Sequence, residues 1–418
     1  MLACLIIGML SGKESTLQAV KWCRLHISYL KKCGLKLANG VASYDTHQRL
    51  LRNIDTDQFA EEFIVWANHA VYLFGVQLAI DGKGLRGGTD RIRGGKTPYM
   101  LNIVDTETKV IVASLPINEK TNEMTAITDA LALISVAGNL FTIDAAGTYV
   151  QIMRAIQEED GHFVLLVKRN NPEAYENLVA FFEKNRKVME KGEDFETGEA
   201  YDYDASGWQS EKNRERHEHR YCERVVIDSD DPGSKDSLWR EVLGESVLGK
   251  NADLFKTVGV LRTVRIPIEY DKDGNDVTPT REEFILHGSG KCGNPKEGDS
   301  EKCDIQVVGV ISDLELKAKD ILLIKRTHWI CEAAHNIIDR TFKEDASNAS
   351  VAKYNTSLVR KCAFNIVKLA VLNGYIDKQL STPMEMIALT EDTAVMRKIL
   401  FDPFPRFHGE GYPGAANQ

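Results

Sequence analysis

The chain has 418 residues, of which 43% are hydrophobic and 27% are charged, and its formal net charge is −9 at pH 7. This composition is typical of a globular protein. The length allows more than one core, because single cores rarely grow beyond about 250 to 300 residues. The net charge excludes a chain that is basic overall, so binding to nucleic acid has to come from local clusters of Lys and Arg.

The eight cysteines form no CxxC pair and no small secreted framework, which indicates reduced thiols in a cytoplasmic protein. No apolar run reaches about 18 residues, so we expect no membrane span. The opening run MLACLIIGML lacks a positively charged n-region, and it predicts a helix rather than a signal peptide.

Apolar residues recur at helical spacing in the first part of the chain, for example Phe59, Phe63 and Trp66. The pattern predicts a small helical domain over residues 1–72, in which Ser43 caps one helix. Two interpretations of this domain remain open. It either packs against the rest of the chain or serves as a module that contacts DNA or a second copy.

From Val76 onward the pattern changes to that of strands, separated by turns and by two amphipathic helices. The predicted strands are Leu78–Lys83, Tyr99–Thr106, Lys109–Ile117, Leu140–Asp144 and His162–Lys168. One helix is expected between the third and fourth strands, and another between the fourth and fifth. The order three strands, helix, strand, helix, strand matches a ribonuclease-H-like core, which is an α/β fold with a mixed sheet.

The remaining chain divides by composition into four further parts of the predicted organisation. Residues 73–185 form the first part of the core, and residues 186–313 form a β-rich insertion. Residues 314–375 return to helical periodicity and complete the core, and residues 376–418 form an irregular tail. The strands expected in the insertion are Tyr221–Ile227, Thr257–Ile266, Glu283–His287 and Ile305–Ile311.

Asp81 and Asp144 each end an apolar strand of the predicted core. A single aspartate at such a place is more often a turn or cap residue, but two at matching strand ends indicate a metal site. Phosphodiester chemistry is well served by two divalent cations about 3.5 to 4 Å apart. Mg²⁺ prefers carboxylate oxygens, so a third acidic residue is needed.

The third acid is expected on a helix within Lys325–Asp345, because residues three, four and seven apart share a helix face. One polar stripe then holds His328, Glu332, His335 and Asp339. We choose Glu332 as the third ligand, with Asp339 and Glu344 as alternatives. Trp329 is expected on the opposite, buried face. A merely solvated helix face is the competing interpretation of the stripe.

A different class of metal site uses the same helix, because Glu332 and His335 form an ExxH unit of the kind found in di-iron bundles. Such sites need the unit twice, on two helices. The second ExxH of the chain, Glu159 to His162, contains Gly161 and falls in a predicted turn. The sequence therefore favours the carboxylate triad.

Basic residues cluster near the predicted metal site, in a glycine-rich loop after the first strand and at the end of the fifth strand. The candidate DNA-binding residues are Lys83, Arg86, Arg91, Arg93, Lys96, Lys168 and Arg169. Glycine permits close approach of a polyanion, and arginine can bind a phosphate through two N–H groups. Together with three acids, these clusters indicate a nucleic-acid track.

Several motifs in order resemble one family nearly end to end. They are AIDGK, LRGG, NEKTNE, TIDAAG, LLVKRNNP, and THWICE followed by DRTFKEDAS. This arrangement is similar to the ISAs-type, H-repeat-associated transposases of bacterial insertion sequences. The resemblance implies a DDE transposase in which Asp81, Asp144 and Glu332 hold two Mg²⁺ ions, with Mn²⁺ as a substitute. Water would attack the element's end, and the freed 3′-hydroxyl would attack target DNA.

The resemblance also implies supporting residues and partners. His328 and Trp329 match the family's HW pair, and Asn122 and Glu123 match its NE pair. The expected partner is double-stranded DNA, which includes both the element ends and the target. A homodimer is expected to bind this DNA at the nucleoid of the bacterial cytoplasm, and no association with a membrane is expected.

Two departures from the family pattern keep alternatives open. Cys331 and Ala333 flank Glu332 where the family usually has Ile and Asn, and the spacing from Glu332 to Asp339 is one residue shorter. One alternative is a catalytically inactive, transposase-derived DNA-binding protein. Another is a nuclease of the same fold that only hydrolyses DNA.

Overall fold

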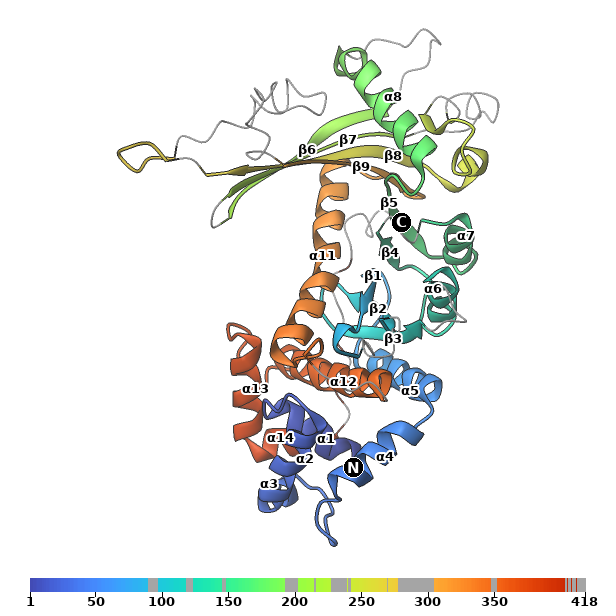
Figure 1. The fold of residues 1–418 in the computed structure, drawn as a ribbon. Coiled ribbons are helices and arrows are strands. Elements are labelled where there is room, and N and C mark those ends of the chain that lie inside the picture. The colour runs from blue at the N-terminus through green and yellow to red at the C-terminus, as the bar shows by residue number, and fades with distance from the viewer. Residues whose placement is uncertain are drawn as a thin grey trace. The chain divides into compact units, whose positions relative to one another are not determined.

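The structure is a computed structural model that describes residues 1–88, 97–117, 123–144, 148–191, 202–213, 216–226, 239, 242–268, 270–276, 304–346, 352–402, 404, 407 and 411. The chain forms two compact units. Unit 1 contains Met1–Asn139 and His328–Gly411, and unit 2 contains Leu140–Thr327. Figure 1 labels the elements of both units.

Unit 1 combines a small antiparallel sheet with helices from both ends of the chain. Its strands, in the order β3-β2-β1, are β1 (Gln77–Gly84), β2 (Tyr99–Asp105) and β3 (Ile111–Ile117). Five helices precede the strands, α1 (Leu2–Leu10), α2 (Thr16–Leu25), α3 (Ile27–Lys32), α4 (Tyr44–Asn53) and α5 (Thr56–Ala70), and α6 (Glu123–Leu131) follows them. The later helices are the second part of α11 (Ala318–Thr341), α12 (Lys353–Leu372), α13 (Thr382–Glu391) and α14 (Thr393–Phe401).

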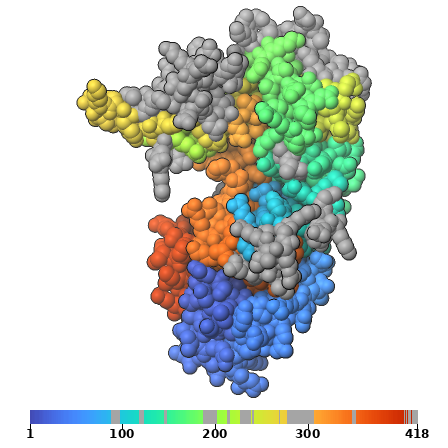
Figure 2. All heavy atoms as spheres, in the orientation of Figure 1, coloured from blue at the N-terminus to red at the C-terminus, as the bar shows by residue number. Residues whose placement is uncertain are grey.

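Helix α12 is the centre of unit 1, because Asn355–Ala370 is buried on every side. It packs against α1, α5 and β3, so helices from the two ends of the chain lie side by side, blue against orange and red in Figure 2. Its buried polar side chains bind groups of neighbouring elements. Asn365 accepts a hydrogen bond from Ile111 N at 2.9 Å and donates to Ile111 O at 2.8 Å, which satisfies the backbone of strand β3.

Unit 2 is built on a mixed sheet with the strand order β4-β5-β9-β8-β7-β6. The strands are β4 (Leu140–Ile143), β5 (His162–Val167), β6 (Asp202–Asn213), β7 (Arg216–Val226), β8 (Thr257–Pro267) and β9 (Asp304–Ser312). Strands β4 and β5 are parallel, and the remaining pairs are antiparallel. The helices are α7 (Val150–Glu158), α8 (Pro172–Lys191) and the first part of α11; α8 and α11 lie on opposite faces of β6–β9 (Figure 1).

The mixed α/β class and most of the predicted strands are confirmed. Ser43 caps α4 as expected, since its side chain accepts from Thr46 N. Helix α8 and strand β6 were not predicted from the sequence. The predicted strand Glu283–His287 lies outside the described residues. Strands of the predicted insertion continue the sheet of unit 2, because β9 pairs with β5.

The expectation of an irregular tail after residue 376 is wrong, because α13 and α14 form there. Helix α14 begins at an effective cap, in which the Asp392 side chain accepts from Ala394 N and Val395 N. The prolines that favoured an irregular tail lie beyond this helix.

Six cysteines within the described part of the chain are free and buried, as predicted for thiols; Cys292 and Cys303 lie outside it. None of the helices described is both long and apolar enough to span a membrane.

Replacing Asn365 with alanine tests how α12 holds β3. The change leaves two buried backbone groups of Ile111 without their partner, and each such group costs about 1 to 3 kcal/mol. We therefore expect a loss of about 2 to 5 kcal/mol in the free energy of unfolding, measured by urea denaturation. Asn373→Ala, which removes only a bond to Leu369 O at the end of α12, is the control. Equal losses in the two variants would contradict this account.

Burial of Lys361 predicts a dependence of stability on pH. Its side chain is 0% exposed and donates to Ser357 Oγ at 2.9 Å, and desolvation lowers its pKa from 10.5 to about 8. Between these values the unfolded chain binds more protons than the folded chain, so folding becomes more favourable as the pH rises. Relative to Lys361→Met, the wild type should gain up to about 3 kcal/mol from pH 8 to pH 10.5. If the difference in unfolding free energy between the wild type and Lys361→Met does not change across this pH range, Lys361 is not desolvated.

Candidate active site

Asp81 lies in a row of polar side chains that crosses the sheet of unit 1. The strand register places Asp81 opposite Asn102, and Asn102 opposite Ser114. Opposite residues of neighbouring strands share a face of the sheet. Ser114 donates to Asn102 Oδ1 at 2.8 Å, and the Asn102 amide donates to His335 Nε2 at 2.9 Å. His335 Nδ1 in turn lies 3.4 Å from Asp81 Oδ2, so the row ends at this carboxylate.

The position of the proton on His335 follows from this row. The Asn102 NH₂ group can only donate, so Nε2 must accept, and the neutral ring then carries its proton on Nδ1. That proton faces Asp81, whose side chain is 30% exposed. The row therefore orients Asp81 while leaving part of its carboxylate accessible.

Helix α11 contacts strand β1 at two points whose spacings match. Asp81 and Lys83 are two residues apart on one face of the strand, about 6.6 Å along it. His335 and Asp339 are four residues apart on one face of the helix, about 6 Å along its axis. His335 therefore meets Asp81, and Asp339 forms an ion pair with Lys83.

A buried network of charges continues behind Lys83. Glu344 Oε2 lies 3.9 Å from Lys83 Nζ, Ser357 donates to Glu344 Oε1 at 2.6 Å, and Lys361 donates to Ser357. Burial raises the pKa of Asp339, although Lys83 opposes this change. The network links β1, α11 and α12, and it fixes the strand that carries Asp81.

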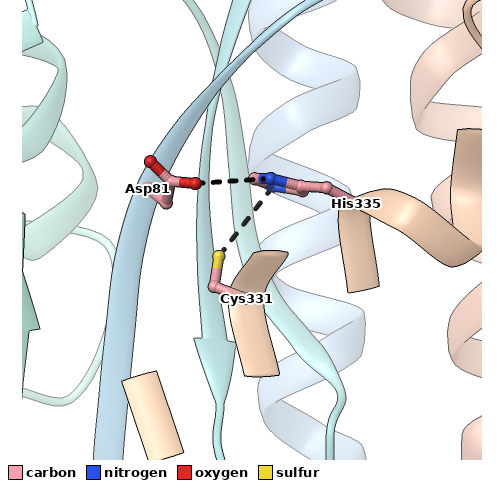
Figure 3. A group of neighbouring side chains, drawn as sticks. All are labelled: Asp81, Cys331 and His335. Carbon is pink, nitrogen blue, oxygen red and sulfur yellow. Dashed lines mark hydrogen bonds and ion pairs between the residues drawn. The ribbon is translucent and has the colours of Figure 1, made fainter. Parts of the chain in front are cut away.

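Cys331 lies one helical turn before His335 and faces the same strand (Figure 3). Its sulfur is 3.9 Å from His335 Nε2, and its side chain is fully buried. Burial, followed by the charges of Asp81 and Glu332, raises the pKa of the Cys331 thiol well above its usual range. The ligand atoms of Asp81, Cys331 and His335 all lie within 4.8 Å of one another.

Glu332 is exposed and lines a cavity of about 600 Å³ beside this cluster. The cavity is also lined by Gly82, Lys83, Gly84, Arg86, Thr97, Tyr99, His335, Asn336, Asp339, Arg340 and Asp345. Burial, together with the charges of Glu123 and Asp81, raises the pKa of the Tyr99 hydroxyl. The cavity thus combines acidic and basic groups next to Asp81.

Asp144 belongs to unit 2, where it follows β4. Its Oδ1 accepts from Lys168 Nζ at 2.7 Å, and Lys168 follows the neighbouring parallel strand β5. The two residues come together because parallel strands end at the same edge of a sheet. Both side chains keep substantial exposure, 46% for Asp144 and 31% for Lys168.

The other predicted residues differ in where they lie. Arg86 and Arg169 are exposed, as a phosphate contact requires. Arg91, Arg93, Lys96 and Asn122 lie outside the described residues.

The predicted phase of α11 is wrong in part. Trp329 is 50% exposed rather than buried, whereas His328 and His335 of the expected polar stripe are buried. The buried stripe of this stretch of helix consists of His328, Cys331, Ala334, His335 and Ile338.

Sequence reasoning missed the roles of Asn102, Ser114 and Cys331. A signal was present, because Asn102 and Ser114 interrupt strands that are otherwise apolar. Their connection to Asp81 depends on the register across three strands, which local patterns do not contain.

Comparison with known proteins places these features in a family. A family model described as "Transposase DDE domain" matches residues 73–351. An uncharacterized protein in the dhlA 3′ region of Xanthobacter autotrophicus is 34% identical over 180 residues, which cover 43% of this chain and 60% of that protein. The putative transposase YncI of Escherichia coli K12 is 29% identical over 195 residues, covering 46% of this chain and 78% of YncI.

A third relative is the H repeat-associated putative transposase YhhI of Escherichia coli K12, which is 30% identical over 165 residues, covering 39% of this chain and 43% of YhhI. The chain spans less than two thirds of the Xanthobacter protein and of YhhI. Because the family model matches more than half of the chain, from before Asp81 to beyond Glu332, the chain belongs to the DDE transposase family.

Proposed function

We propose that this protein is a metal-dependent DNA transposase that cleaves the ends of an insertion sequence and transfers them to target DNA. The observation that carries the proposal is the family match over residues 73–351, which includes Asp81, Asp144 and Glu332. In unit 1, Glu332 lines the cavity together with Gly82, the neighbour of Asp81. A ribonuclease-H-like core remains part of the proposal.

The donors of the proposed triad fit Mg²⁺ in their chemistry. Mg²⁺ takes one or two carboxylates and keeps several waters, so its ligands need exposed oxygens. Asp81 and Asp144 have side chains that are 30% and 46% exposed, and Glu332 is exposed on α11. The proposal for Asp144 rests on its sequence motif, TIDAAG, and on its place after β4.

In the proposed mechanism, Asp81, Asp144 and Glu332 hold two Mg²⁺ ions, or Mn²⁺ in their place. When bound, the ions would supply activation of the attacking oxygen and stabilisation of the leaving oxygen. His335 keeps the Asp81 carboxylate oriented through its Nδ1 proton. Glu123, His328, Trp329 and Asn122 are proposed as supporting residues from the family motifs.

Double-stranded DNA is the proposed substrate, held through phosphate contacts by a protein dimer in the bacterial cytoplasm. Arg86 and Arg169 are exposed and available for such contacts, and Arg91, Arg93 and Lys96 are proposed from the sequence. Lys83 and Lys168 pair with Asp339 and Asp144, so their binding to phosphate requires these ion pairs to open.

A catalytically inactive DNA-binding protein is the second candidate, and one observation favours it. The residues of α11 whose ligand atoms group with Asp81 are Cys331 and His335, and Glu332 is not among them. A wild-type protein that binds DNA but does not cleave it would support this alternative.

Asp81→Asn separates the two candidates. Loss of a metal-binding carboxylate removes several kcal/mol of stabilisation from the transition state, so we expect cleavage of DNA carrying the element's ends to fall at least about a thousandfold. DNA binding, measured by fluorescence anisotropy, should persist. Asp129→Asn, an exposed acid on α6, is the matched control and should cleave as the wild type does. Undiminished cleavage by the Asp81 variant would rule out the proposed triad, and absence of a strand-transfer product would indicate a nuclease.

Arg86 and Arg169 are expected to contact phosphates. Each phosphate contact contributes about one unit to the slope of log affinity against log salt concentration. The double change to alanine should therefore weaken binding and make this slope shallower by about two. Arg397→Ala, on α14, is the control for the loss of a surface arginine. An unchanged slope in the double variant would place the DNA track elsewhere.

A further inference from the structure

The surface of α11 that faces β1 presents sulfur and nitrogen donors to Asp81. Cys331 and His335 are four residues apart and so share one face of the helix. His335 Nδ1 is 3.4 Å from Asp81 Oδ2, and Cys331 Sγ is 3.9 Å from His335 Nε2. An ion bound at about 2.0 to 2.3 Å from each donor keeps its ligands between about 3 and 4 Å apart. With one ligand atom taken from each residue, the three atoms lie within 4.8 Å of one another, so shifts of about 1 Å bring them to the spacing of a metal site.

We propose that Asp81, Cys331 and His335 form a binding site for a thiophilic divalent cation of the Zn²⁺ class. A thiolate, an imidazole and a carboxylate are the ligands that Zn²⁺ accepts, whereas Mg²⁺ prefers oxygen alone. The exposed Glu332 or water supplies a fourth ligand from the adjacent cavity, which His335 also lines. The site meets that cavity at His335.

The residues behind His335 complete the site. Metal-bound histidines usually hold their second ring nitrogen in a hydrogen bond, which fixes the ring. When the ion binds Nδ1 of His335, the ring proton moves to Nε2. The Asn102 amide then flips by 180° so that its Oδ1 accepts a hydrogen bond from Nε2. Ser114 accommodates either amide orientation, because a hydroxyl both donates and accepts. Asn102 and Ser114 are fully buried, so this support is rigid.

The consequence for activity rests on the proposed function. An ion held by Cys331 and His335 takes Asp81 away from the Mg²⁺ site, so Zn²⁺ should inhibit Mg²⁺-dependent cleavage. Binding itself requires no DNA and no catalysis, and it can therefore be tested separately.

The test is titration of the reduced, full-length protein with Co²⁺, which accepts the same ligands as Zn²⁺ and absorbs light. The wild type should show sulfur-to-cobalt charge transfer in the near ultraviolet and the visible bands of tetrahedral Co²⁺, and Zn²⁺ should abolish both. Cys331→Ser should lack the charge-transfer band. Cys362→Ser, which changes another buried cysteine on α12, should retain it.

Two further variants test the nitrogen ligand and its support. His335→Gln should weaken Co²⁺ binding and change the visible bands, and it replaces Cys331→Ser as the decisive variant if that protein does not fold. Asn102→Ala should weaken binding about 10- to 100-fold while the sulfur band remains. Circular dichroism of each variant checks its folding.

The proposal is overturned if saturating Co²⁺ produces no charge-transfer band, or if the band survives in folded Cys331→Ser. Unchanged Co²⁺ binding by folded His335→Gln also overturns it. Failure of DNA cleavage in the wild type, with the Co²⁺ result intact, would instead count against the proposed transposase activity alone.

Discussion

The contact between α11 and β1 is the constraint on which unit 1 depends. The two elements match because two residues along a strand and four residues along a helix cover nearly the same distance, about 6 to 6.6 Å. The chain places an acid and a base at the strand positions, Asp81 and Lys83, and their partners at the helix positions, His335 and Asp339. The same match brings Cys331 beside Asp81, within the strand, and places the cavity lined by Glu332 next to the strand's end at Gly84.

Polar groups in the interior of unit 1 explain why this contact is held in one geometry. An unpaired buried polar group costs free energy, so each one restricts what can lie beside it. Ser114 and Asn102 fix the ring of His335 from the sheet. Glu344 lies beside Lys83, and Ser357 and Lys361 of α12 hold Glu344 in place through hydrogen bonds. The site is therefore supported from two sides, and His335 and Glu332 connect it to the cavity.

Sequence patterns predicted the strands well where apolar runs end at clear turns, as β1, β4 and β5 do. They failed for α8, whose charged residues resemble a loop, and for Trp329, because the buried stripe of α11 contains two histidines. Asp81 was singled out as a candidate ligand because it ends an apolar run. The row from Ser114 to His335 could not be predicted, since it requires the register of three strands and the docking of a distant helix.

The proposed transposase activity requires that Asp81 binds a divalent metal ion for DNA cleavage. Anomalous diffraction from crystals of the protein grown with Mn²⁺ and end DNA tests it most directly, because the scattering identifies the ion and its ligands together. We expect a Mn²⁺ peak coordinated by the carboxylate of Asp81, with Glu332 and Asp144 among the other ligands. An ordered DNA complex whose Mn²⁺ lies away from Asp81, or which binds none, would contradict it.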